Sequence, residues 1–107
     1  PYPDMIKEFV GAYGIKYPGE DLTTDSAHPY IGCQILEQAI LKAGTIDREK
    51  LTEVIHRETF ETIVGPVKYD ERGVNILEKG FLAQCQNTYR VIVWPPELAQ
   101  AEPWFWR

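Results

Sequence analysis

The sequence predicts a fold that contains both helices and strands, with three helices first and short, partly antiparallel strands after them. In the first half of the chain, apolar residues recur at the three- and four-residue spacing of helices that bury one face. In the second half, short runs of β-branched and aromatic residues alternate with glycine, proline and asparagine, which is typical of strands joined by tight turns. Taken by itself, this order of elements describes an α+β domain.

The first predicted helix covers residues 4–13. Its apolar residues lie three or four positions apart and would form a single stripe: Met5, Ile6, Phe9, Val10 and Tyr13. Asp4 is suited to the start of a helix and Gly14 to its end. A loop that contains Pro18 and Gly19 is expected to follow.

The second predicted helix opens near Asp25 and Ser26, which are both good N-cap residues, and ends at Gly44. Pro29 is compatible with this helix only in its first turn, where a missing backbone N–H removes no helical hydrogen bond. The helix is apolar on more than one side, and its polar edge consists of only four residues: Gln34, Glu37, Gln38 and Lys42. We therefore expect this helix to be well buried.

A third helix is predicted to begin with Asp47 as its N-cap and to turn Leu51, Val54 and Ile55 inward. Strands are then predicted at residues 62–64, 67–69, 80–86 and 89–94. Only Asn87 and Thr88 separate the last two strands, which predicts an antiparallel hairpin.

Residues 60–73 predict two short strands around a Gly65-Pro66 corner, followed by an acidic turn. Gly65 can adopt backbone conformations that are closed to other residues, and Pro66 fixes φ and donates no hydrogen bond. Asp70 can accept hydrogen bonds within its own turn, and Gly73 can adopt a positive φ.

Four segments of the chain follow one another in an order that is informative as a whole. They are residues 30–44, which end in Lys-Ala-Gly, residues 45–51, residues 60–73, and residues 91–99, which contain Trp-Pro-Pro-Glu-Leu-Ala. In this order they resemble the C-terminal part of the type I periplasmic binding proteins, the solute receptors of branched-chain amino acid and amide ABC transporters. The resemblance covers most of residues 9–103.

The resemblance implies an α/β fold in which the chain is the C-terminal part of a two-lobed protein several times longer. Residues 1–107 would then be one incomplete segment of a solute-binding domain, whose central parallel strands lie mostly upstream. Without those strands, the helix at residues 30–43 would lack much of the surface that it covers. Burial of an apolar side chain contributes roughly 1.5–3 kcal/mol, so we expect the isolated chain to oligomerise or to swap elements with a second copy.

The function implied by the resemblance involves no chemistry, and no catalytic residue is predicted. The whole protein would be the solute-binding component of an ABC importer for branched-chain or related amino acids or amides. Its partners would be that small-molecule solute and the membrane permease of the transporter, and no cofactor is expected. Its location would be periplasmic or extracellular, with membrane association through the transporter. Two alternatives stay open, namely a ligand-sensing or regulatory domain of the same fold and a stand-alone interaction module that dimerises.

The candidate ligand-binding residues are Asp25, Ser26, His28 and Tyr30. In the resembled family, the N-terminal end of this helix faces the cleft between the lobes, and helix N-termini present free N–H groups and a partial positive charge. An acidic side chain there would suit an ammonium or amide group. A hydrolytic site is not expected from this cluster, because catalytic triads are assembled from positions far apart in sequence. The alternative is a helix cap with a polar first turn.

Charge and composition exclude several other classes of function. A net charge of −5 disfavours binding to nucleic acid and to anionic membrane surfaces. The two cysteines and two histidines match the spacing of no compact zinc site, so no metal is predicted. Cys33 and Cys85 are expected to be buried free thiols, with a disulfide between them as the open alternative.

The C-terminal residues 104–107 contain three aromatic side chains in a row. Such an apolar segment is costly to leave in water, so we expect it to pack against another part of the protein or against a partner surface.

Overall fold

The structure is a computed structural model that describes residues 4–105. Their contacts divide into two units, residues 4–78 and residues 79–105, and each is described by itself. The first unit contains three helices and a two-stranded antiparallel sheet, and the second contains another two-stranded antiparallel sheet. The predicted combination of helices followed by short antiparallel strands is therefore confirmed.

Helix α1 (Asp4–Lys16) is longer than predicted, and none of its residues is buried. The prediction that Gly14 ends it is wrong. A glycine inside a helix costs only about 1 kcal/mol relative to alanine, so the helix continues through it. The chain leaves the helix three residues later in the turn that contains Gly19, whose φ is 85°.

Helix α2 (Thr24–Ala43) has Thr23 as its N-cap, so the prediction of Asp25 or Ser26 in that role is wrong. Because the helix begins at Thr24, Pro29 is its sixth residue and lies beyond the first turn. Proline has no backbone N–H, so the carbonyl of Asp25 receives no helical hydrogen bond from it. The predicted end is confirmed, since Gly44 has φ 66° and donates its N–H to the Ile40 carbonyl.

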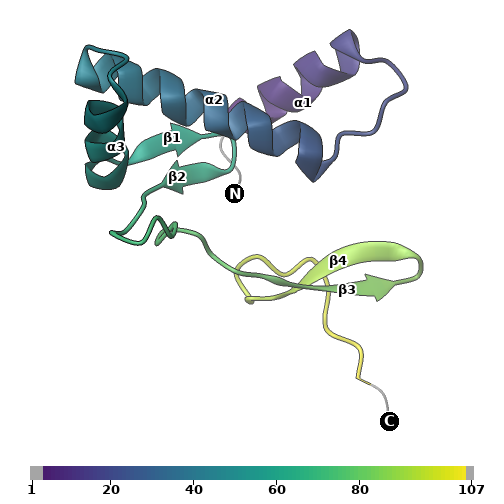
Figure 1. Cartoon of the computed structure of the whole chain (residues 1–107). Coiled ribbons are helices and arrows are strands. Elements are labelled where there is room, and N and C mark those ends of the chain that lie inside the picture. Colours follow the sequence, from purple (N-terminus) through teal and green to yellow (C-terminus); the bar gives the residue numbers. More distant parts are fainter. Residues whose placement is uncertain (1–3, 106–107) are drawn as a thin grey trace. The chain divides into compact units, whose positions relative to one another are not determined.

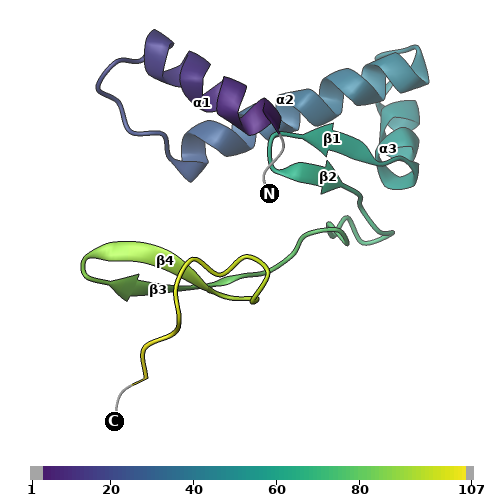
Figure 2. The same ribbon diagram turned by 180° about the vertical axis from the view of Figure 1, so that it is seen from behind.

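The expectation that α2 is well buried is also wrong. Ile35 and Ala39 are its buried residues, whereas Leu36 is 47% exposed and Leu41 76% exposed. Figures 1 and 2 show the reason, because α3 and the small sheet lie along one side of α2. The second apolar side that the sequence indicated is left in contact with solvent.

Helix α3 (Arg48–Arg57) follows the prediction. The side chain of Asp47 accepts a hydrogen bond from the backbone N–H of Lys50 at 3.1 Å, as an N-cap does. Val54 is buried, and Leu51 and Ile55 pack against the core from its margin.

Strands β1 (Phe60–Thr62) and β2 (Gly65–Val67) pair antiparallel, with Phe60 opposite Val67. Both begin two residues earlier than predicted, so Gly65-Pro66 opens β2 and the corner lies at residues 63–64. The buried hydroxyl of Thr62 holds this corner, because it donates to the Gly65 carbonyl at 2.7 Å and accepts from the Val64 N–H at 3.3 Å. The shift also places Phe60 in the core.

The core of the first unit lies where the sheet meets α2 and α3. Its buried residues come from all three, and they are Ile35, Ala39, Val54, Phe60 and Val67. Phe60 and Ala39 are fully buried. The hydrophobic effect therefore ties α2, α3 and the hairpin to one another, whereas α1 contributes no buried residue.

Two glutamines of α2 bind the outer edge of β1. The Gln38 amide donates to the Glu61 carbonyl at 2.8 Å and accepts from the Glu61 N–H at 3.1 Å, as a neighbouring strand would. Gln34 accepts from the Ile63 N–H at 3.0 Å. Both side chains were predicted on a polar edge of the helix, but here they satisfy backbone groups of β1 and of the corner that follows it.

The predicted acidic turn is confirmed between Tyr69 and Asn75, which form an isolated antiparallel bridge. The carboxylate of Asp70 accepts the backbone N–H groups of Arg72 and Val74 at 2.9 and 3.0 Å. The Arg72 guanidinium also donates to it, at 2.8 and 3.0 Å. The N–H of Val74 and the side chain of Arg72 hold the pKa of Asp70 below its ordinary value.

We expect this turn to loosen in acid. Because the pKa of Asp70 is lower in the folded chain than in the unfolded chain, its contribution to stability is complete above the ordinary aspartate pKa. That contribution is lost as the pH falls through the lowered folded value. NMR shifts of the Arg72 and Val74 amides, followed from neutral pH into the acid range, measure this loss. In an Asp70→Asn variant the same shifts should not titrate, and an unchanged titration in that variant would contradict the assignment to Asp70.

In the second unit, β3 (Leu82–Gln86) and β4 (Tyr89–Trp94) form the predicted antiparallel hairpin. Glutamine amides again pair with backbone groups beside the strands. Gln84 accepts from the Trp104 N–H and donates to the Trp104 carbonyl at 2.8 and 2.7 Å. The Gln100 side chain accepts from the Ile92 N–H at 2.9 Å.

Trp104 and Phe105 remain 53% and 83% exposed within this unit. The other two residues of the predicted aromatic tail, 106 and 107, lie outside the described residues.

The turn of this hairpin predicts a stabilising substitution. Asn87 and Thr88 both have positive φ, 49° and 71°, as in a two-residue type I′ turn. A β-branched residue is strained there, so Thr88→Gly should stabilise the hairpin by roughly 0.5–1 kcal/mol. The amide protons of β3 and β4 should then exchange about two to five times more slowly. Asn87→Gly is the matched control and should gain less, because asparagine tolerates this conformation.

Both cysteines are free and exposed, so the expectation of buried thiols is wrong. Cys33 lies on α2 away from its buried residues, and Cys85 pairs with the exposed Arg90 in the hairpin. Among the helices of the described residues, none has the length and apolar character needed to cross a membrane.

Candidate functional site

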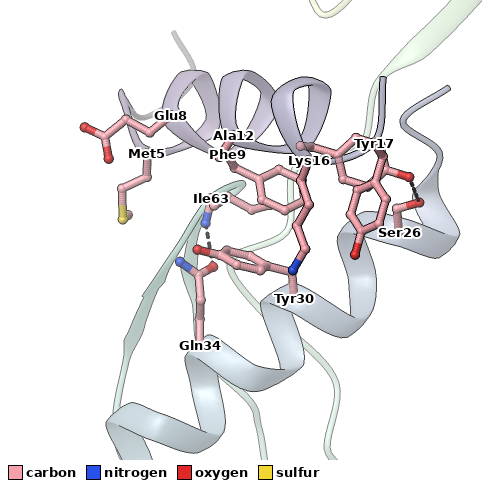
Figure 3. Close-up of a pocket in the computed structure, with 11 residues that line it drawn as sticks. Met5, Glu8, Phe9, Ala12, Lys16, Tyr17, Ser26, Tyr30, Gln34 and Ile63 are labelled. Atoms are coloured by element: carbon pink, nitrogen blue, oxygen red, sulfur yellow. Dashed lines mark hydrogen bonds between the residues drawn. The ribbon is translucent and has the colours of Figure 1, made fainter. Parts of the chain in front are cut away.

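A groove of about 770 Å³ lies between α1 and α2 (Figure 3). Most of its lining comes from one face of α1 and from Tyr17 directly after it, and the rest comes from α2 and the β1–β2 corner. The lining residues are Met5, Glu8, Phe9, Ala12, Tyr13, Lys16, Tyr17, Ser26, Tyr30, Gln34 and Ile63. A volume of this size is typical of small-molecule sites.

A row of aromatic rings runs along the groove. Phe9, Tyr13 and Tyr17 are spaced by four residues, and this spacing brings their side chains to one side of the chain around α1. The ring centroids of Phe9 and Tyr13 are 6.2 Å apart, and those of Tyr13 and Tyr17 are 4.9 Å apart. Tyr30 on α2 joins the row at 4.5 Å from Phe9. These distances are those of attractive aromatic pairs, so the row links the two helices.

Polar groups lie among the rings. The hydroxyls of Tyr13 and Ser26 are 3.2 Å apart and share a hydrogen bond across the groove. The Lys16 ammonium lies 5.7 Å from the centroid of the Tyr17 ring, within the range of a cation–π contact. Gln34 uses its amide oxygen for the Ile63 N–H, which anchors the β1–β2 corner at the groove wall.

The four ligand-binding residues that were predicted from the sequence divide into two pairs in the structure. Ser26 and Tyr30 line the groove, whereas Asp25 and His28 are exposed and are not among its lining residues. The Ser26 hydroxyl bonds to the hydroxyls of Tyr13 and Thr23, at 3.2 and 3.4 Å. Its partners are therefore neutral hydroxyl groups, which do not activate a serine as a nucleophile.

The contribution of α1 to this groove was not predicted from the sequence. Phe9 and Tyr13 were predicted to belong to an apolar stripe that faces a core, and Lys16 and Tyr17 were not predicted as site residues. A signal was nevertheless present, because three aromatic residues recur every four positions, Phe9 and Tyr13 in α1 and Tyr17 directly after it. Two of these three residues are tyrosines, and a stripe that only faces a core does not need their hydroxyl groups.

A second groove, of about 700 Å³, lies beside the acidic turn, and three of its charged side chains, Lys68, Asp70 and Arg72, already have partners. Lys68 donates to the Arg57 carbonyl at 2.8 Å, and Arg72 is paired with Asp70. His56 Nδ1 is 2.8 Å from the Asp70 carbonyl oxygen, so this nitrogen must carry the proton that is donated. These contacts tie the turn to the end of α3, and they favour a structural role for this groove.

Within residues 4–105, no three histidine, cysteine, aspartate or glutamate side chains gather closely enough to hold a metal ion. The sequence was also compared with models of known protein families and with curated protein sequences, and neither comparison gave a match. The groove between α1 and α2 is therefore the candidate site on geometry alone.

Proposed function

We propose that the chain is part of the extracytoplasmic solute-binding component of an ABC importer. In this proposal it forms the C-terminal part of a two-lobed type I periplasmic binding protein, which closes around a branched-chain or related amino acid or an amide. The protein would work in the periplasm or outside the cell and would deliver its solute to the membrane permease. Closure would be favoured by contacts from both lobes to the solute.

The observation that carries the proposal is the order of four sequence segments that resemble this family, at residues 30–44, 45–51, 60–73 and 91–99. The half-exposed state of α2 also supports it. A helix with Leu36 and Leu41 open to solvent has apolar surface that further strands of a larger domain could cover. Ser26 and Tyr30, at the N-terminal end of α2, would contribute to the solute site.

Two experiments test this proposal. The first is the intact mass of the protein in its source cells, detected with an antibody to this segment. A species several times heavier than 12.3 kDa supports a two-lobed receptor, and a band at the size of this chain favours the interaction module instead. The second is calorimetry with a panel of amino acids and amides. The heavier protein should bind one of them, whereas these 107 residues alone should bind weakly or not at all.

The same proposal predicts that the isolated chain associates with itself. Its exposed leucines on α2 and the exposed aromatic residues near its C-terminus lack a covering surface within their own units. Light scattering after gel filtration should therefore give a mass above 12.3 kDa that rises with concentration. A Leu36→Lys, Leu41→Lys double variant should shift the distribution toward the monomer. A clean monomer of the original chain at low and high concentration would contradict the prediction.

A further inference from the structure

We infer that the groove between α1 and α2 binds aromatic carboxylates. The inference goes beyond the proposed function, because it concerns the groove of this chain whether or not the chain belongs to an importer. It depends on two features, the row of aromatic rings and the ammonium of Lys16, which is the one cationic group among the described residues that line the groove.

The aromatic row provides a surface for another ring. Phe9 and Tyr30 come from different helices and meet at 4.5 Å, so they form a wall that spans the groove. Tyr30 is still 44% exposed, and part of its ring is therefore available for contact. A planar ligand that lies against these rings gains the offset or tilted contacts that aromatic groups prefer.

The charge at the groove favours an acid over a base. Figure 3 shows Lys16 extending from α1 toward Tyr30, whereas the carboxylate of Glu8 lies at the other end of the groove and points away from α2. Among the described residues Lys16 takes part in no ion pair, so its ammonium can accept a carboxylate as a partner. An aromatic cation would instead have to displace this ammonium from the rings.

The ligand must have an aromatic ring with a carboxylate a few bonds away from it. An α-amino group on the ligand is optional. Phenylacetate and phenylalanine share this chemistry, and they represent a plain aromatic acid and an aromatic amino acid. The groove is open and the ligand small, so we expect dissociation constants of the order of 1–10 mM. This is weak binding, and it is compatible with the importer proposal, in which the isolated chain binds its solute weakly or not at all.

The test is an NMR titration of the 107-residue chain with phenylacetate, phenylalanine, benzylamine and hexanoate. Phenylacetate should shift the amide signals around Phe9, Ser26 and Tyr30 in a saturable way. Benzylamine has the same ring with the opposite charge and should bind about tenfold more weakly. Hexanoate keeps the charge without the ring and should also bind about tenfold more weakly. A comparison of phenylalanine with phenylacetate shows whether the amino group helps.

Two matched lysine variants separate the site from general charge effects. Lys16→Met keeps the aliphatic stem, and we expect it to weaken phenylacetate binding about threefold, as for a solvent-exposed ion pair. Lys7→Met removes a lysine of the same helix that pairs with Asp4 outside the groove, and it should leave binding unchanged. The same spectra report whether each variant is folded.

The inference is overturned if benzylamine or hexanoate binds as well as phenylacetate, if the two lysine variants behave alike, or if no probe gives a saturable shift. Its failure is distinguishable from failure of the importer proposal. The mass of the protein in its source cells decides that proposal, and the titration of this chain does not enter into it.

Discussion

Replacement of Phe60 by alanine is expected to destabilise the fold of residues 4–78 strongly. The ring of Phe60 is fully buried among Ile35, Ala39, Val54 and Val67, where α2, α3 and the small sheet meet. Removal of such a ring leaves a cavity and costs about 3–5 kcal/mol. Small domains are stable by only about 5–15 kcal/mol in total, so this loss is a large fraction of the stability. Urea denaturation followed by far-UV circular dichroism measures it as a lower midpoint of helix loss.

Phe81→Ala is the matched control for this experiment. Phe81 is 55% exposed and lies in the second unit, so the same change of side chain removes little buried surface. We expect its effect on the helical transition to stay within about 0.5 kcal/mol. Equal effects of the two substitutions would show that Phe60 is not at the centre of the core.

The second large effect is expected from Gln38→Glu. Gln38 donates to two carbonyl oxygens, those of Glu61 at 2.8 Å and Gln34 at 3.0 Å, and accepts from the Glu61 N–H. A carboxylate keeps the acceptor but cannot donate, and it brings negative oxygen against both carbonyls. The Gln34 carbonyl keeps the helical hydrogen bond from the Gln38 backbone N–H, so the cost comes from the lost bond to the Glu61 carbonyl and from the new repulsion. It should be about 1–2 kcal/mol at neutral pH.

Protonation of the new carboxyl group restores one donor, so the cost should shrink as the pH falls. The sign follows from linkage, because contact with two carbonyl oxygens raises the pKa of this carboxyl group in the folded state. The folded state then binds more protons than the unfolded state, and the penalty is greatest above the raised pKa. Denaturation curves at neutral and acid pH, compared with those of the original chain, measure the difference.

Gln34→Glu provides the contrast on the same helix. Within the described residues, Gln34 uses only its amide oxygen, as the acceptor for the Ile63 N–H at 3.0 Å. A carboxylate can make the same bond, so we expect a change below about 0.5 kcal/mol. If both variants lost equal stability, the added charge on an already acidic chain would explain the effect, and the role of Gln38 as a donor would be wrong.

The elements with strong local sequence signals were predicted correctly. Gly44 ends α2 and Asp47 caps α3, because these roles depend only on the backbone conformation of glycine and on a side chain three residues from its N–H partner. The turn at Asn87 and Thr88 and the acidic turn at Asp70 were predicted for the same reason, since each is closed by residues within a few positions of one another.

The errors occurred where distant residues decide the outcome. The register of β1 and β2 depends on the burial of Phe60 against α2 and on the hydroxyl of Thr62, and Gly65-Pro66 by itself indicated a different corner. In the sequence, Gln34 and Gln38 have the pattern of an exposed polar edge. In the structure, their side chains instead form hydrogen bonds with the backbone of Ile63 and Glu61. The groove is a similar case, because Tyr30 was predicted as a site residue, but its partner Phe9 lies on another helix.

The sequence by itself thus determined the class of fold, the order of helices and strands, and the turns and caps that close within a few residues. Only the tertiary structure decided which faces of α2 are covered, where the hairpin turns, and that α1 and α2 enclose an aromatic groove. The physical reason is the range of the forces involved. Backbone conformation and capping act between near neighbours, whereas burial and side-chain pairing depend on residues that the fold brings together from far apart in the chain.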